Sequence, residues 1–345
     1  VSYRACYKPQ LPAYFLQKFC RKPAVIYDPF MGRGTTLVEA QLHGHRAIGN
    51  DINPLAVILT KPRLNPPSLT DIEERLRRVI FDNRANLDPD LLVFFHSDTL
   101  KEIYSWRYYF AHRQPLDHVD AWLQMVACGR LTGHSPGFFS VYTLPPNQAT
   151  SVTAQRKINA KRQQIPLYRD TKALIWRKSR QLLRHPLPRH FHRQDALLLT
   201  TSAEHTPQIP DALVDLIVTS PPFLDTVDYH QDNWLRMWFC DVQIAEGKLW
   251  QLRSVQEWVV CMSAVFHELR RVLKNSGRIA FEVGEIRNGS LQLENEVILA
   301  AKQAGLVAEN ILINTQRFTK TANCWGIANN SKGTNSNRIV VLRRD

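Results

Sequence analysis

The stretch T-S-P-P-F, residues 219–223, combines residue types that could hold an amino-bearing nucleobase. It follows a short apolar run from Val214, which is typical of a buried parallel strand that the two prolines then end. Because proline has no backbone N–H, the Ser220 hydroxyl and the Pro221 carbonyl can act as acceptors, and Phe223 offers a flat ring nearby. Open α/β sheets bind ligands beyond the carboxyl ends of their strands, so the pattern predicts a base-binding site there. A plain surface turn is the alternative.

A second candidate site lies near the start of the sequence, in D-P-F-M-G-R-G-T-T at residues 28–36. The pattern predicts a strand, a glycine loop that lets the backbone approach a ligand closely, and a helix that runs to Leu42. The next predicted strand, Arg46–Asp51, ends in an acid that is well placed to accept hydrogen bonds from ribose hydroxyls. A dinucleotide-binding loop would need glycine at Leu37, and a P-loop would need G-K-[ST]. The sequence therefore indicates a nucleoside cofactor without a pyrophosphate.

Together, D-P-F-x-G-x-G-T, the acidic second strand and T-S-P-P-F resemble the S-adenosylmethionine-dependent DNA methyltransferases that act on exocyclic amines, at cytosine N4 or adenine N6. The resemblance covers roughly residues 5–65 and 190–345. It implies an α/β fold with a Rossmann-like, seven-stranded methyltransferase sheet and an inserted, mostly helical region. It also implies that S-adenosyl-L-methionine binds over the glycine loop and that the S-P-P-F segment holds a flipped base.

The resemblance assigns two sets of site residues. The expected catalytic residues are Ser220, Pro221, Pro222 and Phe223. The expected cofactor-binding residues are Lys8, Asp28, Phe30, Gly32, Gly34, Thr35, Asp51 and Asp195. Asp195 is expected at the end of the third strand, where the family places an acid on the cofactor adenine. Asp98, which follows another apolar run, is the rival for this role.

The expected chemistry follows from the weak nucleophilicity of an exocyclic amine, whose lone pair is delocalised into the ring. Acceptors at Ser220 and the Pro221 carbonyl would bind both amine hydrogens and favour a tetrahedral nitrogen, so no general base or covalent cysteine is required. Serine before the two prolines favours cytosine N4 in the resembled family. The alternatives are adenine N6, an RNA base, an inactive methyltransferase-like nucleic-acid binder and, from another class, a nicotinamide-dependent oxidoreductase.

Positive charge gathers in the middle of the chain. The net charge is +13, and residues 151–193 contain twelve Lys or Arg against one acid, Asp170. A solvated helix face normally mixes both signs, so this segment predicts a surface that binds the phosphate backbone of DNA, with duplex DNA favoured. The expected DNA-binding residues are Arg156, Lys157, Lys161, Arg162, Arg177, Lys178 and Arg180. An Asn-rich loop over residues 323–337 is a second candidate for contact with DNA.

These patterns predict three segments. They are a cofactor-binding part at 1–65, a basic helical insertion at 66–189 and a catalytic part at 190–345. Within the insertion, a capping box at Thr70–Glu73 predicts a helix over 71–82, and Ser254–Glu257 is a second capping box before a long amphipathic helix. Strands over 307–313 and 339–342 with no helix between them predict an antiparallel pair at the sheet edge.

Composition argues against several classes of protein. Of the 345 residues 44% are hydrophobic, which is enough for a globular core. No apolar run approaches the ~20 residues that span a bilayer, and no secretory leader is evident. Six cysteines without a C-x-x-C pair fit neither a disulfide framework nor a zinc site. We therefore expect a cytoplasmic protein that binds neither membrane nor metal. The resemblance to DNA methyltransferases also implies a cognate restriction endonuclease as a candidate partner.

Overall fold

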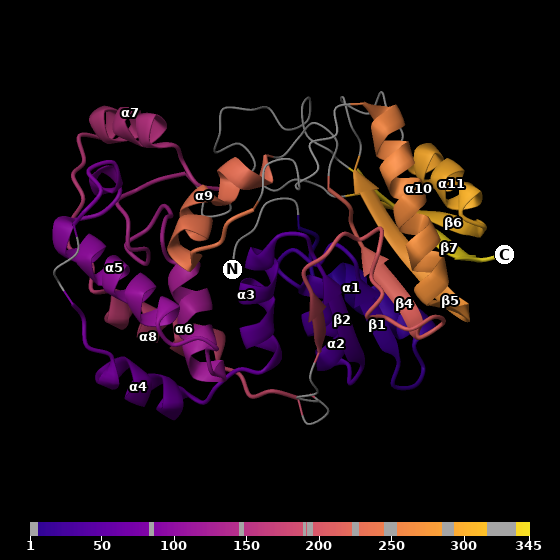
Figure 1. The fold of residues 1–345 in the computed structure, drawn as a ribbon, viewed down its shortest axis with the longest axis horizontal. Coiled ribbons are helices and arrows are strands. Elements are labelled where there is room, and N and C mark those ends of the chain that lie inside the picture. Colours follow the sequence, from indigo (N-terminus) through magenta and orange to yellow (C-terminus); the bar gives the residue numbers. More distant parts are fainter. Residues whose placement is uncertain are drawn as a thin grey trace. The chain divides into compact units, whose positions relative to one another are not determined.

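The computed structural model describes residues 6–82, 86–144, 148–188, 191, 196–222, 228–244, 254–284, 293–315 and 336–345. The chain divides into two compact units (Figure 1). The helical unit comprises Val1–Arg4, Asn53–Arg189 and Asp228–Leu249, and the sheet unit comprises Ala5–Ile52, His190–Val227 and Trp250–Asp345. Each unit has its own core of buried apolar side chains.

The sheet unit contains a seven-stranded sheet with the strand order β3-β2-β1-β4-β5-β7-β6. The strands are β1 (Val25–Asp28), β2 (Arg46–Asn50), β3 (Leu197–Leu199), β4 (Val214–Thr219), β5 (Leu273–Gly284), β6 (Leu306–Thr315) and β7 (Ser336–Arg344). Strands β1 to β5 are parallel, whereas β7 is antiparallel to both β5 and β6. This topology confirms the predicted seven-stranded α/β sheet and the predicted antiparallel pair at its edge.

Helices flank this sheet. They are α1 (Gln10–Phe19), α2 (Thr35–Leu42), α10 (Val255–Val272) and α11 (Leu293–Gln303). Side chains alternate along each strand, and Tyr27 and Ile217 share one core with Val265 of α10. Helix α11 lies beside α10 (Figure 1), while α1 and α2 pack together against β1 and β4. The predicted capping box before α10 is present, because the Ser254 hydroxyl accepts a hydrogen bond from the Glu257 N–H at 3.1 Å.

The third strand differs from the prediction. It begins at Leu197, two residues after Asp195, which itself lies outside the described residues. Leu199 pairs with Asn50 of β2, so the residues at the carboxyl end of β3 are Thr200 and Thr201 rather than Asp195. The apolar run L-L-L forms the strand because it is the part of the segment that can be buried beside β2.

The helical unit is built from seven α-helices and one short 3-10 helix among the residues that the structure describes. They are α3 (Pro54–Leu64), α4 (Leu69–Arg78), η1 (Leu91–Val93), α5 (Ser97–Ala111), α6 (His118–Cys128), α7 (Val152–Arg162), α8 (Thr171–Leu182) and α9 (Tyr229–Cys240). Its core joins Trp106 of α5 and Trp122 of α6 to Leu59 of α3 and Leu235 of α9. The compact unit therefore includes α3 and α9, which flank the predicted insertion of residues 66–189 in the sequence.

Helix α4 begins earlier than predicted. Ser68 caps it, since the Ser68 hydroxyl accepts from the Asp71 N–H at 3.1 Å and the Asp71 carboxylate accepts from the Ser68 N–H at 3.3 Å. The capping box predicted at Thr70–Glu73 is therefore wrong, although both quartets fit the same pattern. Pro66 and Pro67 hold the chain extended up to Ser68, so the helix begins at the first position after them that can cap it.

The residues that the structure describes include no membrane-spanning helix, no metal-binding group and no disulfide. No helix among them is long and apolar enough to cross a membrane. Within the same residues, no three His, Cys, Asp or Glu side chains are placed to hold a metal ion. The cysteines there are free thiols, namely Cys6, Cys20, Cys128, Cys240 and Cys261.

Candidate functional site

The predicted ligand-binding motifs meet at one edge of the sheet. Strands β2, β1 and β4 are adjacent and parallel, so their carboxyl ends share an edge. Asp51 follows β2, the D-P-F glycine loop starts at the end of β1, and Ser220 follows β4. The Thr219 hydroxyl, next to Ser220, donates a hydrogen bond to Asp28 Oδ1 at 2.6 Å. This bond directly joins the S-P-P motif to the glycine-loop motif.

The glycine loop has the backbone conformation that requires glycine. Gly32 has φ of 49° and Gly34 has φ of 72°, both in the left-handed region that side chains with a Cβ disfavour. The Gly32 N–H donates to Asp51 Oδ2 at 2.9 Å, and the Met31 N–H donates to the Asn50 carbonyl at 2.9 Å. The end of β2 therefore holds the loop in place, and Asp51 has a structural contact in addition to the predicted one to ribose.

Asp28 lies beneath this loop and is almost completely buried, with 1% of its surface exposed. Its carboxylate accepts from Tyr7 Oη at 2.8 Å, from the Phe30 N–H at 3.1 Å and from Thr219. Burial raises the pKa of this carboxyl to about 6, although these hydrogen bonds act in the opposite direction. With its oxygens bonded to protein groups, Asp28 fits the role of a residue that positions both motifs.

Tyr7 is a site residue that sequence reasoning missed. Its hydroxyl is hydrogen-bonded to Asp28, to the Thr36 hydroxyl at 2.5 Å and to the Val218 carbonyl at 3.3 Å. Burial raises the pKa of Tyr7 well above its ordinary value, and the negative charge of Asp28 adds to the effect. One phenol thus ties the segment before α1 to β1, α2 and β4. The only signal in the sequence is its position beside Lys8.

Glu282 on β5 is a second residue that was missed. It is 4% exposed, and its carboxylate accepts a hydrogen bond from the Asn337 side-chain amide on β7 at 2.7 Å. Burial raises the pKa of Glu282 to about 7, although the Asn337 bond acts in the opposite direction. Its neighbour Phe281 is the register partner of Thr219, so Glu282 lies one residue beyond, near the carboxyl end of β4. The charge of Glu282 also makes a small contribution that raises the pKa of Tyr7.

Asn50 organises the exit of β3. Its side-chain amide donates to the Thr201 carbonyl at 3.0 Å and accepts from the Thr201 N–H at 3.1 Å. Asn50 is completely buried, so this reciprocal pair is shielded from water and fixes the loop after β3 beside Asp51. The loop backbone after β3 is therefore held at the same edge as the glycine loop, independently of Asp195.

The other predicted site residues have different surroundings. Ser220 is half-buried and Pro221 is buried, and Pro222 is half-buried directly after them. Thr35 is buried at the start of α2 and accepts from Arg33 Nε at 3.3 Å. Lys8 is exposed before α1. Phe223 and Asp195 lie outside the described residues, so their predicted roles stay predictions.

The predicted DNA-binding residues lie on α7 and α8 of the helical unit. Arg156, Lys157, Lys161 and Arg162 are exposed on or at the end of α7, and Arg177 and Arg180 are exposed on α8, where Lys178 is half-buried. Some already have protein partners. Arg156 pairs with Asp90 at 2.6 Å, Lys178 donates to Gln181 Oε1 at 2.7 Å, and the Arg162 guanidinium lies 3.8 Å from the centre of the Tyr142 ring.

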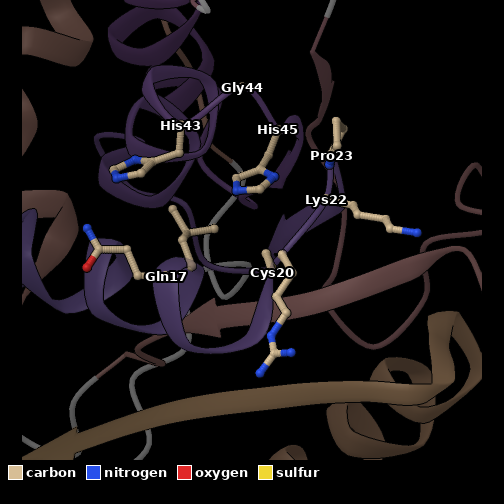
Figure 2. Close-up of a pocket in the computed structure, with 9 residues that line it drawn as sticks. Gln17, Cys20, Lys22, Pro23, His43, Gly44 and His45 are labelled. Atoms are coloured by element: carbon tan, nitrogen blue, oxygen red, sulfur yellow. The ribbon is translucent and has the colours of Figure 1, made fainter.

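A cavity of about 340 Å³ opens at the amino ends of β1 and β2, away from the motif edge (Figure 2). Cys20, Pro23, His43, Gly44 and His45 are among its lining residues. The Ala24 N–H donates to His45 Nδ1 at 3.2 Å, and burial lowers the pKa of His45. Because ligands of such sheets bind at the opposite strand ends, we do not assign this cavity to the predicted cofactor.

Comparison with known proteins agrees with the motifs. A family model described as DNA methylase, of the N6 and N4 methyltransferase type, matches residues 2–61. Over 289 residues the chain is 28% identical to the type II methyltransferase M.MvaI of Kocuria varians. The predicted resemblance to the amino-DNA methyltransferases is confirmed. The family match contains Tyr7, Asp28, the glycine loop and Asp51.

The type II methyltransferases that the chain matches are longer than this chain, which spans only part of their length. The match to M.MvaI covers 73% of this chain and 60% of that protein. A match to the type II methyltransferase M.MjaII of Methanocaldococcus jannaschii is 32% identical. It covers 31% of this chain and 21% of that protein. A solved S-adenosylmethionine-dependent methyltransferase from Methanosarcina mazei is 10% identical over 96% of each chain, with a TM-score of 0.40.

Proposed function

We propose that this chain transfers a methyl group from S-adenosylmethionine to the exocyclic amine of a base in DNA, with cytosine N4 favoured over adenine N6. The observation that carries the proposal is the Thr219–Asp28 hydrogen bond, which brings the S-P-P motif and the glycine loop to one sheet edge. The likeness to type II methyltransferases supports the same reaction class.

The residues at this edge fit a nucleoside cofactor. Two left-handed glycines, Gly32 and Gly34, leave the loop backbone without side chains, and Asp51 supplies a half-buried carboxylate for hydroxyl groups. We expect these residues, with Phe30 and Thr35, to hold S-adenosylmethionine. When bound, that cofactor supplies an electrophilic methyl group on sulfur. Asp28 and Tyr7 would act indirectly, by fixing the loop on β1 and β4.

The S-P-P motif would hold the amine. Ser220 and the Pro221 carbonyl are acceptors for the two amine hydrogens, and such hydrogen bonds favour a tetrahedral nitrogen whose lone pair is available for methylation. The two prolines limit the conformations of this segment, so the acceptors need little reorganisation when a base arrives. Phe223 is proposed to stack on the flipped base. Serine at position 220 is what favours cytosine N4.

The helical unit is the proposed contact surface for duplex DNA. Its exposed cations on α7 and α8 would neutralise phosphates, which gives affinity without sequence specificity. A cytoplasmic location and a cognate restriction endonuclease are further predictions.

One experiment identifies both the polymer that is methylated and the atom that receives the methyl group. Labelled methyl transfer from S-adenosylmethionine would be measured on duplex DNA, single-stranded DNA and RNA in parallel, and the products would be identified by nucleoside mass analysis. We expect N4-methylcytosine from duplex DNA. Detection of N6-methyladenine would change the proposed target from cytosine to adenine. Detection of methylated RNA would change the proposed polymer from DNA to RNA. Nucleic-acid binding with no transfer to any substrate would instead favour an inactive binder.

A further inference from the structure

A half-buried arginine in the helical unit is held against an aromatic ring. Arg130 follows α6, and its guanidinium lies 4.0 Å from the centre of the Phe138 ring. Its Nε donates to the Gly129 carbonyl at 2.9 Å, and its own carbonyl accepts from the Phe139 N–H at 2.8 Å. The loop that contains Phe138 and Phe139 thus fixes both the backbone and the side chain of Arg130.

Other cations surround Arg130. Arg177 on α8 reaches the same loop, where its Nη2 donates to the Pro136 carbonyl at 3.4 Å. Arg236 on α9 is 7% exposed, and its Nη1 donates to Asn233 Oδ1 at 2.8 Å. Burial, together with the charges of Arg177 and Arg236, lowers the pKa of Arg130 to about 10. Burial and the charge of Arg130 lower the pKa of Lys178 in turn. We call Arg130, Arg177 and Lys178 the Arg130 cluster.

Carboxylates neutralise other arginines of this unit. Arg75 pairs with Asp117 and Asp120, Arg77 with Glu73, and Arg156 with Asp90. Within the described part of the chain, neither Arg130 nor Arg177 has such an ion pair. Like charges that converge in a partly buried place repel one another, and the repulsion is relieved when an anion binds. The loop that contains Pro136 and Phe138 holds Arg130 and Arg177 close together in the free protein.

We propose that the Arg130 cluster is a binding site for a phosphodiester group of the DNA backbone, reached through the exposed side chain of Arg177. The proposal rests on the proposed function, which supplies DNA as the substrate, and adds a specific phosphate site that includes Arg130, outside the basic segment of the sequence. Guanidinium groups bind phosphate oxygens through paired N–H donors, and stacking on Phe138 fixes the orientation of one such donor plane. The other exposed cations of α7 and α8 then add nonspecific attraction.

The test compares affinity for duplex DNA over a range of salt concentrations. Arg177→Gln, at an exposed position, should flatten the slope of log K against log salt by about one unit, and Arg130→Gln with Arg177→Gln by about one to two. Arg130→Lys keeps the charge but loses the planar donors, so we expect weaker binding with a smaller change in slope. The matched control is Arg77→Gln with Arg78→Gln, which removes the same number of charges from exposed positions on α4.

Several outcomes would overturn the site. One is a wild-type slope and affinity in both Arg177→Gln and the double variant, and another is an equal loss in the α4 control. Inorganic phosphate at matched ionic strength separates the two sources of phosphate: if the protein bound free phosphate in a way that depends on Arg130, while duplex affinity depended on neither Arg130 nor Arg177, the cluster would be a site for free phosphate only. Circular dichroism checks the fold of each variant, and Arg177→Gln keeps the test valid if the Arg130 variants misfold.

The two proposals can fail separately. If the wild-type protein transfers methyl groups and DNA binding does not depend on Arg130 or Arg177, only the proposed phosphate site is disproved. If DNA binding depends on both residues but the protein transfers no methyl group, only the proposed function is disproved.

Discussion

At Asp28, one buried carboxylate connects two motifs that lie about 190 residues apart in the sequence. It accepts from the loop that is expected to hold the cofactor and from the residue before Ser220. A carboxylate that is fully occupied in this way positions the site rather than binding a ligand directly. Asp51 differs from Asp28 in exposure, because it is half-buried at the end of β2, and it is the better candidate for ribose contact.

Replacing Asp51 tests the cofactor placement. Charge-assisted hydrogen bonds contribute on the order of 1.5 to 3 kcal/mol, so Asp51→Ala should weaken S-adenosylmethionine binding by about ten- to a hundred-fold. Loss of the Gly32 contact would act in the same direction. Isothermal calorimetry measures the effect. Asp211→Ala, which removes the exposed partner of Arg271, is the control and should bind normally. An unchanged dissociation constant in Asp51→Ala would refute the placement.

The buried Glu282 predicts a dependence of stability on pH. Its pKa is raised from 4.5 to about 7 in the folded protein, so its favourable contribution is complete below pH 4.5 and is lost as the pH rises through 7. Glu282→Gln keeps an acceptor for Asn337 but does not titrate. The variant should therefore gain free energy of unfolding relative to wild type between pH 4.5 and 7, by up to about 3 kcal/mol, with no further gain above.

Urea unfolding of both proteins at a series of pH values checks this. The titration of Asp28 is common to both proteins and cancels in the difference. Parallel pH curves for wild type and Glu282→Gln would show that the Glu282 carboxyl does not titrate in this range.

At the scale of elements, α7 allows a test of the proposed DNA surface that does not involve the Arg130 cluster. Lys157 and Lys161 are exposed on this helix. If both face phosphates, replacing them with Ala should flatten the slope of log K against log salt by about one to two units on any sequence. Fluorescence anisotropy with two unrelated duplexes measures this. A wild-type slope would assign α7 to solvent and leave α8 and the Arg130 cluster as the DNA surface.

The elements also show where sequence reasoning works. Strands such as β1 and β4, and helix α10, have strong periodicity and clear end signals, and they form as predicted. The start of β3 and the cap of α4 were predicted wrongly, because in each case two neighbouring patterns competed. Pairing with β2 determined the start of β3, and the prolines before Ser68 determined the cap of α4. Pairing with β2 is absent from the local sequence, whereas the prolines directly before Ser68 are present in it and could have identified the cap.

Site residues follow the same rule. The placement of Gly32 and Gly34 in one loop beside Asp51 was predictable because their residue types and spacing are tied to a strand-loop-helix unit, whereas their contact with a cofactor stays a prediction. Tyr7 and Glu282 were not, because their roles depend on contacts with distant residues such as Val218 and Asn337. Arg130 was missed for a similar reason: its neighbours come from α8 and α9, and its own stretch of sequence is not strongly charged.

At the scale of the whole molecule, the two predicted activities belong to different compact units. The cofactor motifs lie in the sheet unit, and the basic helices lie in the helical unit. Substitutions should therefore separate cofactor binding from DNA binding: Asp51→Ala should change only the former, and the α7 and Arg130-cluster variants only the latter. Effects of either class on both measurements would show that the two units are energetically coupled.

The proposed function requires that the S-P-P motif holds the amine that is methylated. The most direct measurement is methyl transfer to duplex DNA by wild type, Ser220→Ala and the control Ser263→Ala on α10, with cofactor affinity measured by calorimetry on the same samples. Removing the Ser220 acceptor should abolish or strongly reduce transfer and leave the dissociation constant of S-adenosylmethionine nearly unchanged, as should Phe223→Ala, whereas Ser263→Ala should behave like wild type. Wild-type transfer by Ser220→Ala, or loss of cofactor binding by that variant while it remains folded, would show that Ser220 does not hold the amine.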